Sequence, residues 1–248
     1  MERMTSLEKG LNILNIFTEK PYRYTVGDIV ELTGMNRTTV YRNLKTLENS
    51  GLLMRNPGDK SYSMGPVAFR LGNTYLNNVN YEENILNILE EIGKETHESV
   101  GLARREGNRV MSIYSVEIHQ AIKMHDKPGT FYPANKGTYG KGLMAYHEDI
   151  SEELLKSGEI FLADDSSLTD PADIMKEYEK IRKEGLVLSI EETFSYVIGV
   201  GVPLRSQDGK VSHLLAVSFF KQDNWEEEIG RIKEILFKYK GELEKYMV

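Results

Sequence analysis

The sequence predicts an α+β protein built from two domains. Its 248 residues exceed one average domain, since most domains hold ~100–200 residues. Helical and hairpin patterns fill the first third of the chain, whereas strand and helix patterns separated by turn signals fill the remainder. The two parts also differ in charge, which indicates that they meet different partners.

The charge difference is large. Residues 1–80 contain ten Lys and Arg against seven Asp and Glu, a net charge of +3. The total is −7, so the rest of the chain carries −10. The acidic total argues against a nucleic-acid partner for the whole molecule, but that argument does not hold for the basic first part. From residue 34 to 50, Glu48 is the only acid beside Arg37, Arg42 and Lys45.

Composition excludes several classes of protein. Hydrophobic residues make up 40% of the chain and charged residues 28%, which suits an ordinary core. The longest apolar run, residues 197–204, is far shorter than the ~18 residues that span a bilayer. Because the chain also starts without a secretory signal pattern, we expect a cytoplasmic protein with no membrane partner. The lack of cysteine excludes disulfides, cysteine-ligated metals and a thiol nucleophile.

Two short helices are predicted at the start of the chain. The first covers residues 6–17, and its wide apolar stripe consists of Leu7, Leu11, Ile13, Leu14, Ile16 and Phe17. The second covers residues 26–32 and is expected to bury Ile29, Val30 and Leu32. Both apolar stripes are expected to face one shared core.

A third helix is predicted over residues 37–50. Gly34 precedes it, where a tight turn needs a residue that tolerates positive φ, and Asn36 fits the N-cap. Its buried stripe repeats every three or four residues through Val40, Leu44 and Leu47. The polar and basic side chains fall outside this stripe, so the helix has a basic outer face.

A β-hairpin is predicted after the third helix. Residues 52–54 and 60–64 are typical of short strands, and the turn between them contains Pro57 and Gly58. Helix, glycine turn, basic helix and hairpin in this order are typical of a winged helix-turn-helix. Such a helix fits the major groove of B-form DNA, while the flanking loops neutralise phosphates.

We therefore expect this part to bind double-stranded operator DNA. Arg42 suits a bidentate contact with guanine, and Thr38 and Thr39 suit contacts with a phosphate or a thymine methyl group. The expected DNA-binding residues are Asn36, Arg37, Thr38, Thr39, Tyr41, Arg42, Lys45, Arg55 and Lys60. The alternative, a module that binds another protein, is disfavoured because the basic side chains avoid the buried stripe and continue onto the hairpin.

The remaining elements follow an α+β order. A connecting helix is expected over residues 66–81, with a joint at residues 77–80, where asparagines weaken helix formation. Residues 128–133 are expected to form an irregular loop. The other expected elements are helices at 82–96, 138–146, 173–184 and 225–246 and strands at 99–104, 109–115, 186–190, 197–203 and 211–219.

Residues 25–47 carry the strongest motif of the first part. This segment contains Thr39-Val40-Tyr41-Arg42, and Tyr62-Ser63-Met64-Gly65 closes the hairpin after it. It resembles the winged helix-turn-helix of IclR-type transcriptional regulators. The rest of the chain resembles the effector-binding domain of the same family, with landmarks at Pro133, Gly140-Lys141-Gly142-Leu143-Met144-Ala145, residues 185–192, residues 200–204, residues 208–211 and residues 215–218. The resemblance implies a GAF- or profilin-like α/β effector-binding domain with an antiparallel sheet, in a homodimer or homotetramer.

The start of the helix after Gly137 is the candidate effector site. A helix start preceded by a glycine offers backbone N–H groups and a positive field to a small anion, although a structural loop with a surface lysine is the plain alternative. The resemblance implies further contacts, and two of these positions depart from the family: Ser189 stands where Asp is usual, and Gly199 where Cys or Ser is usual. We therefore hypothesise a pocket of altered shape. The expected effector-binding residues are Thr138, Tyr139, Gly140, Lys141, Ser189, Glu191, Gly199 and Ser218.

The sequence contains no recognisable catalytic motif. No two of the five histidines, His97, His119, His125, His147 and His213, have the i, i+4 spacing of a helical zinc site. Residues 137–142 lack both the first glycine and the final Ser or Thr of a phosphate-binding loop, and no Gly-x-Ser-x-Gly occurs. We expect no enzyme activity, no metal and no cofactor.

The sequence thus predicts a one-component transcriptional regulator, with repression as the expected mode. A small carboxylate or sugar acid bound in the C-terminal domain is expected to change its affinity for DNA. The expected domains are residues 1–65 for DNA binding, 66–80 as a linker helix and 81–248 for effector binding and oligomerisation. The alternative function is a protein-interaction winged helix joined to a small-molecule-binding or enzymatic C-terminal domain.

Overall fold

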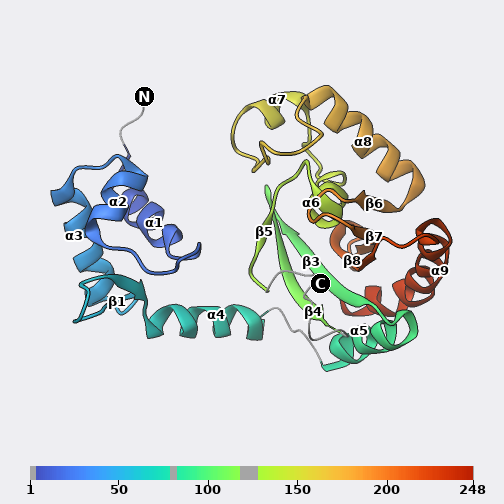
Figure 1. Cartoon of the computed structure of the whole chain (residues 1–248), viewed down its shortest axis with the longest axis horizontal. Helices are drawn as coiled ribbons and strands as arrows, with labels where there is room; N and C mark the ends of the chain where they lie inside the picture. The colour runs from blue at the N-terminus through green and yellow to red at the C-terminus, as the bar shows by residue number, and fades with distance from the viewer. Residues whose placement is uncertain (1–3, 79–82, 118–127, 248) are drawn as a thin grey trace. The chain divides into compact units, whose positions relative to one another are not determined.

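The computed structural model describes residues 4–78, 83–117 and 128–247 of the chain (Figure 1). The chain divides into two compact units, Met1–Tyr81 and Glu82–Val248. Each unit has a hydrophobic core of its own. The predicted α+β fold in two parts is confirmed.

The first unit combines three packed helices, a two-stranded hairpin and a trailing helix. Its elements are α1 (Ser6–Ile16), α2 (Val26–Thr33), α3 (Arg37–Asn49), β1 (Leu53–Arg55), β2 (Tyr62–Met64) and α4 (Pro66–Asn78). Thr5 and Thr25 begin α1 and α2 with capping boxes, and the Asn36 side chain begins α3 by accepting a hydrogen bond from Thr39 N at 2.8 Å. Gly34 ends α2 with φ of 65°, as the turn requires.

The core of the first unit lies between α1, α2 and α3. The stripe predicted for α3 is confirmed, because Val40, Leu44 and Leu47 are all buried. They pack with Ile13 and Ile29, which are fully buried on α1 and α2. This packing holds the polar and basic side chains of α3 on the outer face of the unit.

Three leucines that were expected in this core are exposed. Leu7 and Leu11 on α1 are 72% and 50% exposed, and Leu32 on α2 is 60% exposed. Periodicity shows which side of a helix is apolar, but it does not show how much of that side a neighbour covers. In a unit of this size the core reaches only the Ile13 side of α1, so the apolar stripe is wider than the core.

The second unit is built on a curled, six-stranded antiparallel sheet with strand order β5-β4-β3-β8-β7-β6. The strands are β3 (Ser99–Glu106), β4 (Arg109–Val116), β5 (Phe131–Tyr132), β6 (Val187–Ile190), β7 (Val197–Arg205) and β8 (Val211–Phe220). The helices are α5 (Glu83–Thr96), α6 (Gly137–Met144), α7 (Glu152–Lys156), α8 (Pro171–Glu184) and α9 (Trp225–Leu243), followed by the 3-10 helix η1 (Glu244–Tyr246). Figure 1 shows α5 and α9 on one side of the sheet and α6 with α8 on the other. Both faces of the central strands are therefore covered.

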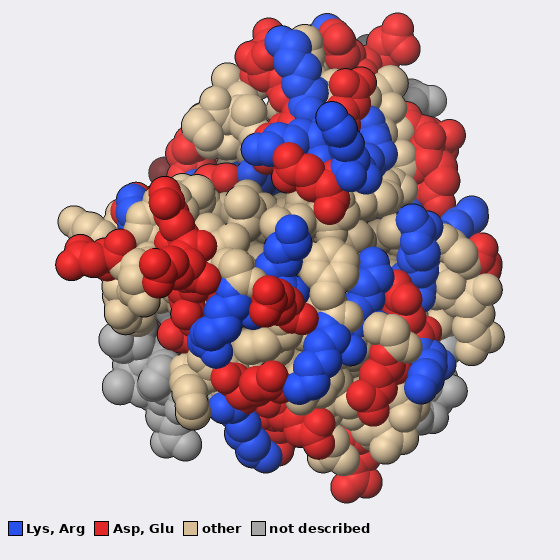
Figure 2. Space-filling model, turned by 90° about the vertical axis from the view of Figure 1, so that its right-hand side faces the viewer, with Lys and Arg blue, Asp and Glu red and all other residues tan. Residues whose placement is uncertain are grey.

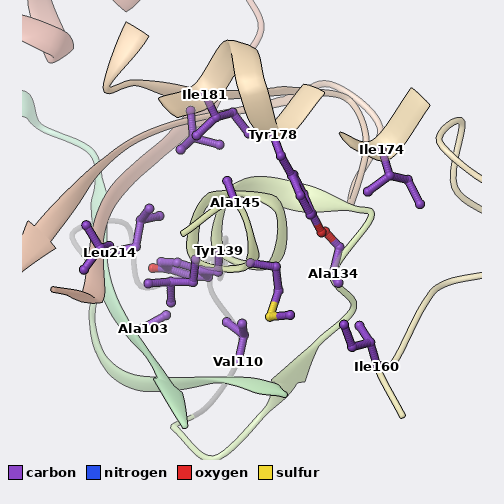
Figure 3. Close-up of a cluster of buried hydrophobic side chains, with 14 of the residues drawn as sticks. Ala103, Val110, Ala134, Tyr139, Ala145, Ile160, Ile174, Tyr178, Ile181 and Leu214 are labelled. Carbon is purple, nitrogen blue, oxygen red and sulfur yellow. The ribbon is translucent and has the colours of Figure 1, made fainter. Parts of the chain in front are cut away.

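Helix α6 is the most enclosed helix of this unit, because all its residues are buried. Tyr139 of α6 shares one hydrophobic cluster with Ile174, Tyr178 and Ile181, which lie at i, i+4 and i+7 on α8 (Figure 3). The Tyr178 hydroxyl donates to the Ala134 carbonyl oxygen at 2.8 Å. The start of α6 is thus fixed between the sheet and α8.

Most elements predicted for the second unit are confirmed, with ends that shift by a few residues. Residues 128–133 were expected to be irregular, but they contain β5, which pairs with β4. Helix α7 was not predicted, since five residues are too few for periodicity to show. The joint expected at residues 77–80 lies partly in α4 and partly outside the described residues. Within the described ranges, no helix has both the length and the apolar character to cross a bilayer.

Candidate functional site

The first unit has a surface groove between α2, α3 and the hairpin. The residues that line it are Thr25, Val26, Gly27, Arg37, Thr38, Tyr41, Arg55, Asp59 and Lys60. Five of the nine expected DNA-binding residues are among them. The groove forms because α3 packs on α2 through its apolar stripe, while β1 and β2 follow α3 after a short turn. Helix, hairpin and the start of α2 therefore present one continuous polar surface.

Three exposed cations line this groove, and a fourth, Arg42, lies further along α3. Arg37, Arg42, Arg55 and Lys60 are exposed, and none of them forms an ion pair within the described residues. The Arg55 guanidinium lies 5.9 Å from the centroid of the Tyr62 ring, which supports its position on the hairpin. Cations that lack an acidic partner are available to phosphates.

The other expected residues of α3 have different surroundings. Lys45 is exposed and pairs with Glu48 at 3.1 Å. Asn36 is exposed but uses its side-chain oxygen to cap α3, and Thr39 is half-buried. Arg42 and Lys45 lie on α3 beyond the residues that line the groove.

Asp59 is the acidic residue among those that line the groove. Its carboxylate accepts hydrogen bonds from Ser61 Oγ at 2.7 Å and Ser61 N at 2.9 Å. These bonds lower the pKa of Asp59, the side-chain bond more than the backbone bond. The ionised carboxylate holds the hairpin turn that carries Lys60.

The second unit has a cavity at the start of α6. The residues that line it are Tyr132, Gly137, Thr138, Tyr139, Ser189, Thr193, Phe194, Val197, Gly199, Ala216 and Ser218. The space inside this cavity that a water-sized molecule can occupy is about 40 Å³. Five expected effector-binding residues, Thr138, Tyr139, Ser189, Gly199 and Ser218, are brought together there.

The floor of this cavity is a row of small residues across three strands. Ser189 of β6 pairs with Gly199 of β7, and Gly199 pairs with Ser218 of β8. Partners in a sheet point to the same face, so the two serines flank the glycine. Aromatic rings stand beside the floor: the centroids of Tyr132 and Tyr139 are 5.0 Å apart, with planes tilted by 57°. The cavity thus combines hydroxyl groups with aromatic walls.

The N-terminus of α6 borders the cavity without a side-chain cap of its own. Lys136 is the N-cap residue and makes no capping hydrogen bond with its side chain. Gly137 N instead donates to Glu192 Oε2 at 2.8 Å. The next two amides belong to Thr138 and Tyr139, which line the cavity. N–H groups in the first turn of a helix have no partner within the helix, so they suit an anion.

Lys141 is held away from the cavity. It is 2% exposed, and its ammonium group contacts Glu192 Oε1 at 2.6 Å, Glu177 Oε1 at 3.1 Å and the Leu188 carbonyl oxygen at 3.1 Å. The plain alternative of a surface lysine is therefore wrong. One Glu192 carboxylate binds both Lys141 and Gly137 N, so it fixes the position of α6 relative to the β6–β7 loop.

Two other expected effector residues lie outside the cavity lining. Glu191 is exposed, forms an ion pair with Lys221 and accepts a hydrogen bond from Tyr196 N at 3.1 Å. The Lys221 hydrogen bond is the main reason why the pKa of Glu191 is lowered. Gly140 packs against the Pro133 carbonyl oxygen, which a Cβ at this position would overlap.

Sequence reasoning missed part of both sites. Val197 and Ala216 lie two positions before Gly199 and Ser218 on the same strands, so strand alternation could have found them. Thr193 and Phe194 come from an irregular loop, and Tyr132 from the unpredicted β5, where no pattern pointed to them. Thr25, Val26 and Gly27 in the groove belong to the predicted motif at residues 25–47, but they were not named as DNA-binding residues. In the part of the chain that the structure covers, no three His, Cys, Asp or Glu side chains gather to hold a metal ion.

Both parts of the chain match models of known protein families. The IclR helix-turn-helix domain matches residues 6–57, and the C-terminal domain of bacterial transcriptional regulator IclR matches residues 73–241. The HTH-type transcriptional regulator KipR of Bacillus subtilis is 25% identical over 228 residues, which are 91% of this chain and 90% of KipR.

Solved structures show the same fold. An IclR transcriptional regulator from Alicyclobacillus acidocaldarius has a TM-score of 0.76 at 23% identity, with 100% of both chains covered. An IclR homologue from Microbacterium hydrocarbonoxydans, solved in complex with 4-hydroxybenzoate, has a TM-score of 0.73 at 21% identity, covering 96% of this chain and 99% of that chain.

Proposed function

The chain belongs to the IclR family of DNA-binding transcriptional regulators with an effector-binding domain, and on that premise we propose that it is a repressor controlled by a small organic acid. Family membership makes it a regulator rather than an enzyme. The proposal adds the mode of regulation, the class of effector and the residues that bind DNA and effector.

The groove of the first unit and the exposed face of α3 are the proposed DNA interface. Helix α3 enters the major groove, where the Arg42 guanidinium suits the two acceptors of guanine. Arg37, Arg55 and Lys60 are exposed and lie around one groove, which suits contacts with phosphates on either side of the helix. Asn36 and Thr39 set the start of α3 and hence its position on the DNA.

One observation carries the effector proposal: the cavity lies at the N-terminus of α6 and is lined by hydroxyl groups and aromatic rings. A carboxylate there accepts hydrogen bonds from the amides of the first helical turn and from neighbouring hydroxyls. The body of the acid then contacts Tyr132, Tyr139 or Phe194. The 4-hydroxybenzoate complex of the Microbacterium homologue supports an organic acid as effector class.

Assembly and coupling complete the proposal. A single winged helix buries little DNA, so useful affinity requires two half-sites and a homodimer or homotetramer. The proposed domains are residues 1–65 for DNA binding, 66–80 as linker and 81–248 for effector binding and oligomerisation, with α4 in the linker. The acid regulates DNA binding only if its affinity differs between the DNA-competent and DNA-incompetent arrangements.

A salt-titrated DNA-binding assay on the full-length protein tests this function. The probe is the DNA upstream of the protein's own gene, with a scrambled fragment as control, each measured alone and with pyruvate, gluconate or 4-hydroxybenzoate. We expect tight binding to the upstream DNA that falls steeply with salt, and release by one of the acids. Equal binding to both fragments contradicts specific DNA recognition, and no response to any acid contradicts the effector class.

A further inference from the structure

Thr138 is wedged between its own helix and two glycines of β7. An ideal Cβ built on Gly199 would lie 2.2 Å from Thr138 Oγ1, and one built on Gly201 would lie 2.6 Å from Thr138 Cγ2. Both distances are far below ordinary contact, so neither strand position has room for a side chain while Thr138 is present. The two glycines form a socket that receives both branches of the threonine.

The socket also sets the direction of the Thr138 hydroxyl. Its methyl group lies over Gly201, which does not line the cavity, and its hydroxyl lies over Gly199, which does. A rotation about χ1 has to move the oxygen or the methyl group out of the socket, and β-branched side chains already have few rotamers. The hydroxyl is therefore held on the cavity side before any ligand arrives.

The surroundings of this hydroxyl suit an anion. Ser189 and Ser218 flank Gly199 in the same cross-strand row, and both line the cavity. The backbone amide of Thr138 belongs to the first turn of α6, whose N-terminal N–H groups attract negative charge. The buried cation of this helix, Lys141, is paired with Glu177 and Glu192, so its charge is not available to a ligand. Recognition of an acid here must rest on neutral donors.

We propose that Thr138 is the specificity-determining residue of the effector cavity and that its hydroxyl donates a hydrogen bond to the carboxylate of the acid. Gly199 has no side chain and so leaves space for the Thr138 hydroxyl. This inference rests on the proposed function, since it assumes an acidic effector. A hydroxyl held in place loses little freedom when it binds, and a hydrogen bond to an ion is stronger than one between neutral groups. The competing explanation is that Thr138 only fills space between α6 and β7.

Thr138→Val separates these explanations, because valine keeps both branches of the side chain and removes the hydroxyl. Thr138→Ser is the matched variant that keeps the hydroxyl. Binding of pyruvate, gluconate and 4-hydroxybenzoate to the full chain is measured by calorimetry, and folding by the fluorescence of Trp225, the single tryptophan. For the acid that binds the wild-type protein, we expect binding about tenfold weaker in Thr138→Val and weakened less in Thr138→Ser. The thermal midpoint of Thr138→Val should stay close to that of the wild type, and that of Thr138→Ser should be slightly lower because the buried methyl group is lost.

A second pair of variants moves the hydroxyl from the helix to the strand. Gly199→Ser alone is expected to lower the thermal midpoint and abolish binding, because the new Cβ overlaps Thr138 Oγ1. In Thr138→Ala/Gly199→Ser that oxygen is gone, and the nearest remaining atom, Thr138 Cβ, is 3.4 Å away. The double variant is expected to regain the midpoint and to bind the acid more tightly than Thr138→Ala.

The outcomes separate the two proposals. Binding of an acid that is equal in wild type and Thr138→Val overturns the role of Thr138 and leaves the proposed function intact. The same role is overturned if Gly199→Ser folds and binds like the wild type. If none of the three acids binds the wild-type protein, the effector class in the proposed function is wrong, and the Thr138 inference fails with it.

Discussion

The two units of this chain use their lysines and arginines in opposite ways. In the first unit, Arg37, Arg42, Arg55 and Lys60 are exposed and have no acidic partner within the described residues. In the second unit, Lys141 is buried between two glutamates, and the face in Figure 2 shows Lys and Arg interspersed with Asp and Glu. The cations around the groove of the first unit are available to a partner, whereas the buried cation of the second unit is neutralised internally. A net charge summed over the whole chain hides this division.

The largest expected effect comes from removing the buried cation. Lys141→Met leaves Glu177 and Glu192 without their shared partner, and breaking a buried ion pair costs about 3–5 kcal/mol. Denaturant unfolding followed by Trp225 fluorescence measures the free energy of unfolding of the second unit. Lys176→Met on α8 is the matched control, since its side chain is 74% exposed and its pair with Asp173 is a surface pair. Equal stability of the two variants would contradict the contrast between buried and exposed cations.

The next effect concerns an exposed cation of the first unit. Arg42→Ala is expected to weaken binding to the upstream DNA by about 1–3 kcal/mol and to reduce its preference over a scrambled fragment, because a bidentate contact with guanine carries sequence information. Lys183→Ala in the second unit is the control: its side chain is also exposed, and its removal should leave DNA affinity unchanged. Fluorescence anisotropy with both fragments measures the two affinities. An unchanged preference in Arg42→Ala would favour the interaction-module alternative for the winged helix.

A pH titration sharpens the same contrast, because all five histidines lie beyond the first unit. Burial, and secondarily the charge of Arg104, lowers the pKa of His213 to about 3, whereas an unfolded chain has a histidine pKa of about 6.5. As pH falls below about 6.5, His213 becomes protonated in the unfolded chain but stays neutral in the folded unit. The free energy of unfolding therefore falls by up to about 1.4 kcal/mol per pH unit.

The measurement is the free energy of unfolding, followed by Trp225 fluorescence between neutral and mildly acidic pH. His213→Gln is the comparison, since it removes the titrating group from the buried site. Its stability should fall less steeply with acid than that of the wild type. Parallel pH profiles would show that His213 does not carry the effect.

Much of the fold followed from local signals in the sequence. The caps at Asn36 and Gly34 and the stripe through Val40 and Leu44 predicted the helix-turn-helix, since each depends only on neighbours in sequence. The exposure of Leu7 could not be predicted, because it depends on how far a neighbouring element reaches.

The effector cavity likewise contains some residues that the sequence predicted and others that it could not predict. The helix start at Thr138 and the strand residues Ser189 and Ser218 were found from motif and resemblance, and they line the cavity. Phe194 lies on a loop whose path depends on tertiary contacts, and the burial of Lys141 depends on Glu192, which is 51 residues away. Pairings over such distances leave no periodic pattern in the sequence.

The central claim, that exposed and unpaired cations of the first unit contact DNA, is tested most directly by the salt dependence of DNA binding. Arg37→Ala/Arg55→Ala/Lys60→Ala is compared with Lys156→Ala/Lys176→Ala/Lys183→Ala, which removes the same charge from the second unit. For the first variant, the slope of log affinity against log salt should become shallower by about one for each cation that binds a phosphate in the wild-type protein. The second variant should keep the wild-type slope. Equal slopes in the two triple variants would contradict the claim.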